Sequence, residues 1–240
     1  MSPVDNPVTR RYLTGEYLAH NPTWDSEDSV WKAHQVLTIL HAHGIRPATV
    51  VDVGCGAGAV LAELRKALPN ARFTGFDIAP DAQRFWKHHA GIEFRLGDFL
   101  TLSDGRYDVL LALDVLEHLQ DPFDFLVRIR PRAAHFVFHF PLDLSALTVL
   151  REAPLLSQRR QVGHIHYYTR GLALALLEEC GYEVVGWRYT GAAFTAPRRT
   201  VKTRVAALLR RAAYTVARDA GVRLLGGETL MVVARAGRAP

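Results

Sequence analysis

The feature that most constrains this chain is the stretch 49–61, Thr-Val-Val-Asp-Val-Gly-Cys-Gly-Ala-Gly-Ala-Val-Leu. It begins as a mostly β-branched run, which is typical of a strand buried on both faces. Glycines at positions 54, 56 and 58 follow, and an apolar helical pattern then continues to Pro69. A strand, a glycine turn and a helix bring backbone amides and a helix N-terminus against a ligand. Glycine suits this turn because it has no Cβ to hold the ligand away from the backbone.

The charges near this turn bear on which ligand binds there. Residues 54–59 also satisfy the dinucleotide pattern G-x-G-x-x-G/A, so the glycines alone leave NAD and FAD open. Asp52 lies where an anion repels a pyrophosphate but suits an ammonium or sulfonium group. Asp77 ends the next strand, about 20 residues on, where a carboxylate accepts both ribose hydroxyls. Asp98 and Phe99 follow a third strand and offer an acceptor for an adenine amine and a ring to stack on it. These carboxylates predict a cationic adenosine compound without phosphate.

In these residues the sequence resembles the class I S-adenosylmethionine-dependent methyltransferases. The matching segments, in the family's order, are 51–58, Asp77, 97–99 and 107–119. The resemblance is nearest to the small-molecule branch with a Glu-His pair after the fourth strand, as in ubiquinone-pathway O-methyltransferases. It implies S-adenosyl-L-methionine as the cofactor, with these predicted binding residues: Asp52, Gly54, Cys55, Gly56, Gly58, Asp77, Ile78, Asp98, Phe99, Leu113 and Asp114.

Strand and helix patterns alternate along the chain from residue 48. Strands are predicted at 48–53, 72–77, 92–96, 107–113, 134–140, 183–189 and 228–234, and helices at 58–68, 80–90, 121–130 and after Thr169. Such alternation requires right-handed crossovers and a mostly parallel sheet with helices on both faces. The predicted fold is therefore a Rossmann-like α/β domain with seven strands. The resemblance implies an antiparallel last strand, here preceded by a helical insertion.

The predicted domain organisation has two parts. Residues 1–46 form an N-terminal lid or helix, and residues 47–240 form the methyltransferase domain with a basic helical insertion at 190–227. The resemblance implies that the N-terminal segment folds over the cofactor and part of the acceptor pocket. The alternative is a helix that only covers the sheet.

An oxygen acceptor must lose its proton before or during methyl transfer, so candidate bases were sought at the carboxyl edge of the sheet. His118 follows the fourth predicted strand, where ligands bind in such sheets, and a histidine pKa lies near working pH. His164 and His166 project alike if their segment is extended, and the resemblance places that segment beside the acceptor pocket. The predicted catalytic residues are His118, His164 and His166. The alternative for His118 is a loop-orienting or cofactor-contacting role.

A divalent metal is an alternative use of the same residues. Glu117 and His118, with His164 and His166, supply nitrogen and oxygen ligands. Some relatives with a Glu-x-x-Glu-His motif bind an ion this way, but Asp114 stands here in place of the first glutamate. The preferred interpretation has no metal, because paired histidines more often hydrogen-bond substrate or backbone.

Composition limits the compartment and the class of acceptor. The two cysteines, Cys55 and Cys180, fall inside predicted elements and indicate a reducing compartment. The first residues lack the apolar region of a signal peptide, and no apolar run of about 18 residues exists. We therefore expect a cytoplasmic protein. No Asn/Asp-Pro-Pro-aromatic motif follows the fourth strand, so methylation of nucleic-acid bases is disfavoured.

The insertion carries much of the positive charge of a chain whose net charge is +5. Its length of about forty residues is unusual for a connection in this fold and suggests a function. Its only acid is Asp219, against these basic residues: Arg198, Arg199, Lys202, Arg204, Arg210, Arg211, Arg218 and Arg223. One helical face carries Val201, Val205, Leu208, Leu209, Ala212 and Val216. A basic amphipathic helix is typical of a surface for anionic lipid or nucleic acid. The alternative is an apolar stripe that packs on the domain or on a second subunit.

Taken together, these patterns predict methyl transfer from S-adenosylmethionine to an oxygen of a small or lipid-linked acceptor, such as a sugar or a phenol. Two other classes compete: an NAD-binding Rossmann oxidoreductase, and a non-catalytic module that only binds S-adenosylmethionine. The expected partners are the acceptor, an anionic membrane contacted peripherally, and a second copy of the chain. Nucleic acid is not expected as a partner.

Overall fold

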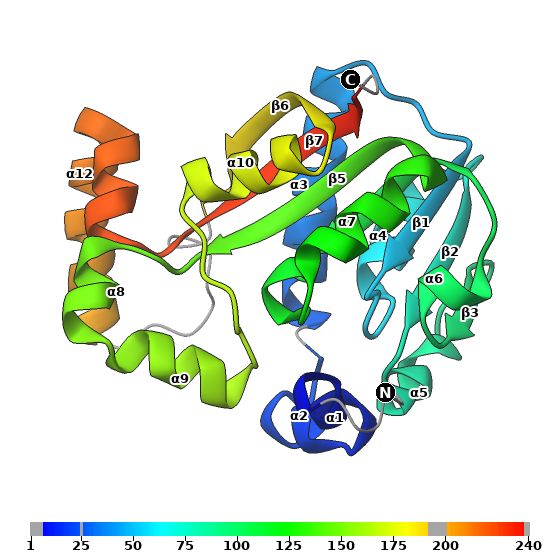
Figure 1. Cartoon of the computed structure of the whole chain (residues 1–240), viewed down its shortest axis with the longest axis horizontal. Coiled ribbons are helices and arrows are strands. Elements are labelled where there is room, and N and C mark those ends of the chain that lie inside the picture. The colour runs from blue at the N-terminus through cyan, green and yellow to red at the C-terminus, as the bar shows by residue number, and fades with distance from the viewer. Residues whose placement is uncertain (1–6, 25, 192–200, 238–240) are drawn as a thin grey trace.

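The computed structural model describes residues 7–24, 26–191 and 201–237. Its sheet has the strand order β3-β2-β1-β4-β5-β7-β6 (Figure 1). The strands are β1 (Thr49–Val53), β2 (Arg72–Asp77), β3 (Glu93–Leu96), β4 (Tyr107–Leu113), β5 (Ala133–Leu142), β6 (Tyr182–Tyr189) and β7 (Glu228–Ala236). β7 runs antiparallel to both of its neighbours, and all other neighbouring pairs are parallel. The predicted fold class, including the antiparallel last strand, is confirmed.

Helices cover both faces of the sheet and form two apolar layers with it. Figure 1 shows α7 (Pro122–Ile129) and α10 (Arg170–Glu179) on one face, with α3 (Ser29–Ala42) and α4 (Ala59–Ala67) on the other. Val51 packs in the first layer and Val50, its neighbour in β1, in the second. Successive side chains of a strand point to opposite faces, so both must be apolar when both faces are covered. This explains the continuous apolar run of β1.

Several connections are shorter or more irregular than predicted. The expected helix 80–90 is a 3-10 turn, η3 (Pro80–Ala82), followed by α5 (Gln83–Trp86). Its end is fixed by Trp86, whose indole is buried and donates a hydrogen bond to the carbonyl of Gly56 at 2.8 Å. Other short elements are α6 (Phe99–Leu102), η4 (Leu116–His118) and η5 (Arg130–Arg132).

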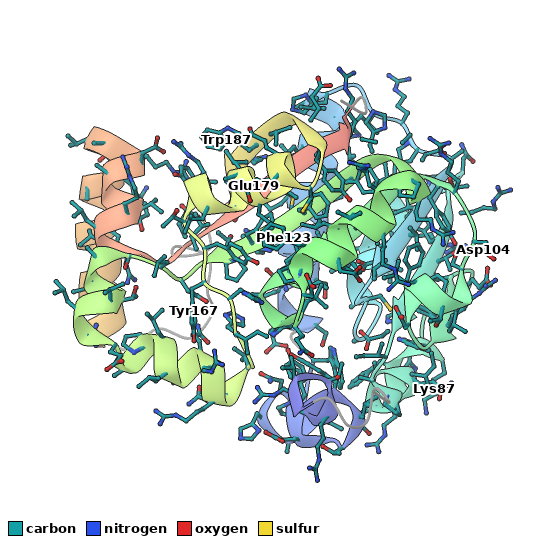
Figure 2. All side chains as sticks on the ribbon, viewed as in Figure 1. Lys87, Asp104, Phe123, Tyr167, Glu179 and Trp187 are labelled. Carbon is teal, nitrogen blue, oxygen red and sulfur yellow. The ribbon has the colours of Figure 1, made fainter. Side chains whose placement is uncertain are left out.

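Short helices also occur where no helix was predicted. α1 (Pro7–Leu13), α2 (Glu16–His20) and η2 (Ser26–Asp28) precede α3, and α8 (Ala146–Arg151) and α9 (Ala153–Gln161) follow β5. In α8, Ser145 and Thr148 form a capping box, which satisfies the first free amides of the helix. Tyr167, labelled in Figure 2, anchors the next segment to α9 by donating its hydroxyl to the carbonyl of Leu155.

The basic insertion contains the helix α12 (Val201–Leu225), which is kinked at Ala217. Tyr214 and Val222 are buried against the domain, and Arg218 pairs with the buried Glu228 at 3.0 Å. Val216 does not belong to the packed face, as its side chain is 89% exposed. Tyr214, two residues earlier, is the side chain that packs, and residues two apart on a helix lie on opposite sides. The predicted residues Arg198 and Arg199, and the side chains of 201–205, 208, 209 and 212, lie outside the described part. Among the described helices, none has the length and apolarity needed to span a membrane.

Candidate active site at the carboxyl edge of the sheet

A cavity of about 470 Å³ opens where β1, β2, β4 and β5 end. Its lining includes ten of the predicted site residues: Asp52, Gly54, Cys55, Gly56, Asp77, Ile78, Leu113, Asp114, His118 and His164. Segments far apart in sequence complete it, namely α1 to α3 on one side and α9 on the other. The sequence therefore located both the edge of the sheet and most of the residues that meet there.

The glycine turn forms one wall of the cavity. Gly54 and Gly56 have φ of +78° and +52°, a region that side chains other than glycine rarely adopt. A Cβ on Gly54 would lie 2.7 Å from Val115, and one on Gly56 would lie 2.5 Å from the Trp24 ring. Asp77 braces the turn, because its carboxylate accepts hydrogen bonds from the amides of Gly56 and Ala79, each at 2.8 Å. The side chains of Val115 and Trp24 thus pack directly against the turn, which only glycine allows at these two positions.

Asp52 is the carboxyl group in this wall that a bound cation would stabilise most. It is buried, and its Oδ1 has no hydrogen-bond partner among the described residues. Burial, and then the neighbouring Asp77, raise the pKa of Asp52 to about 8. Burial also raises the pKa of Asp77, although three backbone amides oppose it. The described lining has five carboxyl side chains and one lysine, and that excess of acid fits a cationic ligand better than a phosphate.

Four predicted site residues do not line the cavity. Gly58 begins α4, and a Cβ there would meet the Phe94 ring at 2.5 Å, so its small size serves packing between helix and strand. Asp98 is exposed and caps α6 by accepting from the amide of Leu100. Phe99 is buried in the core against Phe76, so its ring is not presented to the cavity. The fourth, His166, is described with the histidine cluster.

A second group of lining residues, Glu117, His118 and His164, forms a buried cluster where η4 meets the 163–168 segment. Glu117 is 0% exposed, and neither of its carboxyl oxygens has a hydrogen-bond partner in the described part of the chain. The Nε2 atoms of His118 and His164 each lie 3.9 Å from Glu117 Oε1. Burial and the nearby Asp114 raise the pKa of Glu117 well above that of an exposed glutamate. Burial and His164 lower the pKa of His118 to about 4, so it is neutral at physiological pH.

His166 is turned away from this cluster. Its Nε2 lies 2.9 Å from the carbonyl of Leu119, and its own backbone amide donates to Glu117 O. The amide of Ile165 makes the same backbone contact at 2.8 Å, so the segment is pinned to η4 with His164 inside and His166 outside. The prediction that both histidines face the site is therefore wrong for His166.

The cluster also bears on the metal alternative. One ligand atom each from Glu117, His118 and His164 lie within 4.8 Å of one another, a spacing that a divalent ion could bridge. Asp114 is not part of this group, because its carboxylate is bound by Lys32 at 2.8 Å and His139 at 2.6 Å. The donor set is thus two imidazoles and one carboxyl group, without the second acid of the Glu-x-x-Glu-His pattern.

Several cavity residues were not predicted from the sequence. Trp31 and Lys32 come from α3, and His139 comes from β5. Asp143, directly after β5, is not part of the lining but hydrogen-bonds His164, which is. Two signals were present: a histidine inside the apolar strand Phe-Val-Phe-His-Phe, and an aspartate directly after that strand. Tyr12, Tyr17 and Trp24 form an aromatic group over the cavity, with Tyr17 and Trp24 ring centres 5.0 Å apart.

Comparisons with known proteins agree with this geometry. The sequence model of a family described as methyltransferase domain matches residues 31–186. A malonyl-[acyl-carrier protein] O-methyltransferase of Geobacter sulfurreducens is 26% identical over 120 residues, which cover 47% of this chain and 45% of that protein. A ubiquinone biosynthesis O-methyltransferase of Vibrio parahaemolyticus is 30% identical over 117 residues, which cover 43% of this chain and 49% of that protein. The chain thus spans about half the length of the curated relatives it matches.

Among solved structures, the plantazolicin methyltransferase BpumL in complex with SAH superposes with a TM-score of 0.55 and 17% identity. That match covers 99% of this chain and 93% of the other, and shows a shared fold. The fold and the edge site define a class I Rossmann-like methyltransferase. The chain belongs to the methyltransferase domain family, whose methyl donor is S-adenosylmethionine, as the sequence predicted. Membership of this family favours methyl transfer over the competing oxidoreductase interpretation.

Proposed function

We propose that this chain transfers a methyl group from S-adenosylmethionine to a hydroxyl oxygen of a small or lipid-linked acceptor, such as a sugar or a phenol. The observation that carries the proposal is one cavity with two unlike ends. An acidic end contains Asp52 and Asp77 beside the glycine turn, and a histidine end contains His118 and His164. The first suits a cationic adenosine compound and the second suits a hydroxyl.

At the acidic end, Asp77 is placed to accept the ribose hydroxyls and Asp52 to face the cationic part of the donor. The turn residues 54–56 line the same cavity. Bound there, the donor supplies an electrophilic methyl group, so the protein needs few reacting groups of its own. The remaining task is to orient the acceptor and to exclude water.

At the histidine end, we propose that His118 and His164 contact the acceptor. Both imidazoles can form a hydrogen bond with a hydroxyl, and the hydrogen bond between Asp143 and His164 Nδ1 sets which ring nitrogen of His164 is free for it. The relatives named above are O-methyltransferases, which favours oxygen over nitrogen as the acceptor atom. We also propose that residues 1–46 act as a lid, since Tyr12, Tyr17 and Trp24 line the cavity. The proposed mechanism uses no metal.

A lipid-linked acceptor is favoured by one further feature. Leu150 of α8 is 85% exposed, and α8 lies beside α12, where Val216 is exposed as well. In Figure 1, α8, α9 and α12 form a lobe at one end of the sheet, and α9 also contributes Gln158 and Val162 to the cavity. We propose that this lobe contacts anionic lipid peripherally, at the cytoplasmic face of a membrane.

Liposome flotation tests the lipid contact. Wild-type protein should float with acidic liposomes at low salt and be released at high salt, because screening weakens surface charge interactions. Leu150→Asp should reduce flotation, whereas the matched change Val30→Asp, on an exposed position of α3, should not. Wild type that stays with the soluble fraction at low salt would show that the lobe serves the fold or a second subunit.

Label transfer tests the proposed reaction. Purified protein is incubated with methyl-labelled donor and fractions of a cell extract, and the labelled product is isolated. The label should enter a small or lipid-linked compound as a methyl ether that withstands mild base. Label in protein, nucleic acid or an amine would contradict the proposal. Label in a base-labile ester would show that the acceptor atom is a carboxylate oxygen and not a hydroxyl oxygen.

A further inference from the structure

A hydrogen-bonded group of three side chains, Lys32, Asp114 and His139, also lines the cavity. Asp114 Oδ2 lies 2.8 Å from Lys32 Nζ, and Asp114 Oδ1 lies 2.6 Å from His139 Nδ1. The carboxylate can only accept, so Nδ1 of His139 carries the proton and donates it to this bond. Lys32 and His139 thus hold the two oxygens of the Asp114 carboxylate, and a proton on Nδ1 leaves Nε2 as the ring nitrogen whose lone pair faces the cavity.

Two polar atoms beside this group have no partner. His139 is 2% exposed and lines the cavity, yet its Nε2 makes no hydrogen bond with the described residues. The buried Nε1 of Trp31 likewise lacks a described partner, and its ring meets His139 edge-on at 5.8 Å. Leaving such atoms unpaired is costly, and each such case calls for an explanation. A hydroxyl satisfies both, because it accepts from Trp31 and donates to His139.

Asp114 is also held in an unfavourable backbone conformation. Its φ is +55°, a left-handed conformation that few residues other than glycine adopt. The strain lies next to Val115, which a Cβ on Gly54 would touch at 2.7 Å. Residues 114 and 115 therefore adjoin the donor-binding turn, and strain kept at such a position points to a role in the site.

We propose that Trp31 and His139 bind the acceptor hydroxyl that is methylated, and that His139 Nε2, oriented by Asp114, takes its proton. This proposal rests on the proposed function, methyl transfer to a hydroxyl, and identifies His139 as the base that takes the hydroxyl proton. Lys32 and Asp114 are positioning residues, because they act through His139. His118 and His164 then hold the rest of the acceptor.

The step balances without any further reactant. The hydroxyl O–H bond breaks and its proton passes to Nε2 of His139. The oxygen forms its bond to the methyl carbon as the carbon–sulfur bond of the donor breaks, and the electron pair leaves with the thioether. Asp114 stabilises the resulting imidazolium through the bond to Nδ1. His118 is less suited to this role, because a base whose pKa is about 4 takes a proton poorly at neutral pH.

The test uses two substitutions of the same residue in the full-length protein. His139→Asn keeps a donor for Asp114 but lacks the nitrogen that takes the proton. His139→Ala opens a space that added imidazole can enter. Both should lower kcat by about 10²–10⁴-fold, the usual range for losing a general base, with donor affinity unchanged by calorimetry. Imidazole should restore part of the activity of His139→Ala. Trp31→Phe should raise KM for the acceptor more than it lowers kcat.

His135→Asn is the matched control, since His135 lies on β5 four residues earlier, away from the cavity. It should behave as wild type. His139→Asn with a wild-type kcat would overturn the proposal, and so would a loss in His139→Ala that imidazole does not relieve. A parallel loss of donor binding in both variants would also overturn it and indicate a structural role. If wild type itself methylates no hydroxyl, the proposed function fails, and that result is separate from any difference between the variants.

Discussion

Asp143 Oδ2 lies 2.6 Å from His164 Nδ1. In the chain, Asp143 precedes α8 and His164 follows α9. The pair fixes the His164 ring so that Nε2 looks toward Glu117, 3.9 Å away. Asp143 is itself held in place, since its carbonyl accepts the Thr148 hydroxyl of the capping box at 2.7 Å. A rigid carboxylate thus sets the tautomer of a histidine in the cavity.

The first prediction follows from this pair. Asp143→Asn should lose the charge-assisted hydrogen bond, worth about 1.5–3 kcal/mol, and release the His164 ring. Because His164 contacts the acceptor in our account, KM for the acceptor should rise while donor affinity stays the same. Steady-state kinetics and calorimetry measure both. Asp104→Asn is the control, as Figure 2 shows Asp104 at the far edge of the molecule. Equal KM values for the acceptor in the two variants would show that Asp143 does not affect acceptor binding.

The second prediction concerns pH and Asp52. The raised pKa of about 8 means that this carboxyl group is mostly protonated at neutral pH and ionises as the pH rises through 8. The cationic donor should therefore bind more tightly at higher pH, by up to about tenfold per unit below the pKa. Calorimetry from about pH 6 to 9 checks this against the demethylated thioether product, which lacks the sulfonium charge.

Asp52→Asn provides the internal control for that experiment. It should flatten the pH dependence of donor binding, because no carboxyl group remains to ionise at this position. A donor and a product with the same pH dependence in wild type would show that Asp52 does not face the sulfonium. A dependence that survives in Asp52→Asn would assign it to another group.

The third prediction concerns metal. The candidate donor set has one carboxyl group and lacks the second acid of the Glu-x-x-Glu-His pattern, so we expect methyl transfer to continue in a chelator. Elemental analysis of purified protein should find no stoichiometric divalent ion. Activity that a chelator abolishes, and that one divalent ion restores, would instead assign Glu117, His118 and His164 as ligands.

The fourth prediction concerns α12. Arg218→Ala removes the partner of Glu228, a buried carboxylate that also accepts from the amides of Gly191 and Thr229. The loss should be about 1–2 kcal/mol of unfolding free energy, reduced from a fully buried pair because Arg218 is partly exposed. Urea unfolding measures it, with Arg211→Ala, at an exposed position of the same helix, as control. Equal stability of the two variants would mean that this end of α12 adds nothing to the fold.

Sequence reasoning reached the fold because its signals were local. The β-branched run before Gly54, the carboxylate at the end of β2 and the alternation of elements each follow from backbone geometry at one place in the chain. The same reasoning assigned Asp98 and Phe99 to the cofactor site, because they follow a strand in a motif of the resembling family, but neither lines the cavity. The structure uses Asp98 to cap α6 and Phe99 to fill the core, roles that short polar and aromatic residues serve equally well.

The rest of the site depends on contacts between distant segments. Lys32 and Asp114 are 82 positions apart, a pairing that no local period indicates. His164 and His166 looked equivalent because extended segments alternate, but two backbone bonds from Ile165 and His166 to Glu117 decide which one faces inward. Val216 belonged to the predicted apolar stripe, but it is Tyr214, on the other side of the helix, that packs on the domain.

The central claim is that Asp52, Asp77 and the glycine turn form a site for S-adenosylmethionine. Calorimetric titration of the wild-type protein and of Asp77→Ala with S-adenosylmethionine and with NAD tests it most directly. Wild type should bind the methyl donor and not NAD. Asp77→Ala should weaken the binding of S-adenosylmethionine by about 2–4 kcal/mol, because two hydrogen bonds from the ribose hydroxyls to the carboxylate are lost. Binding of NAD without any response to S-adenosylmethionine, or equal donor affinity in the two proteins, would contradict the account.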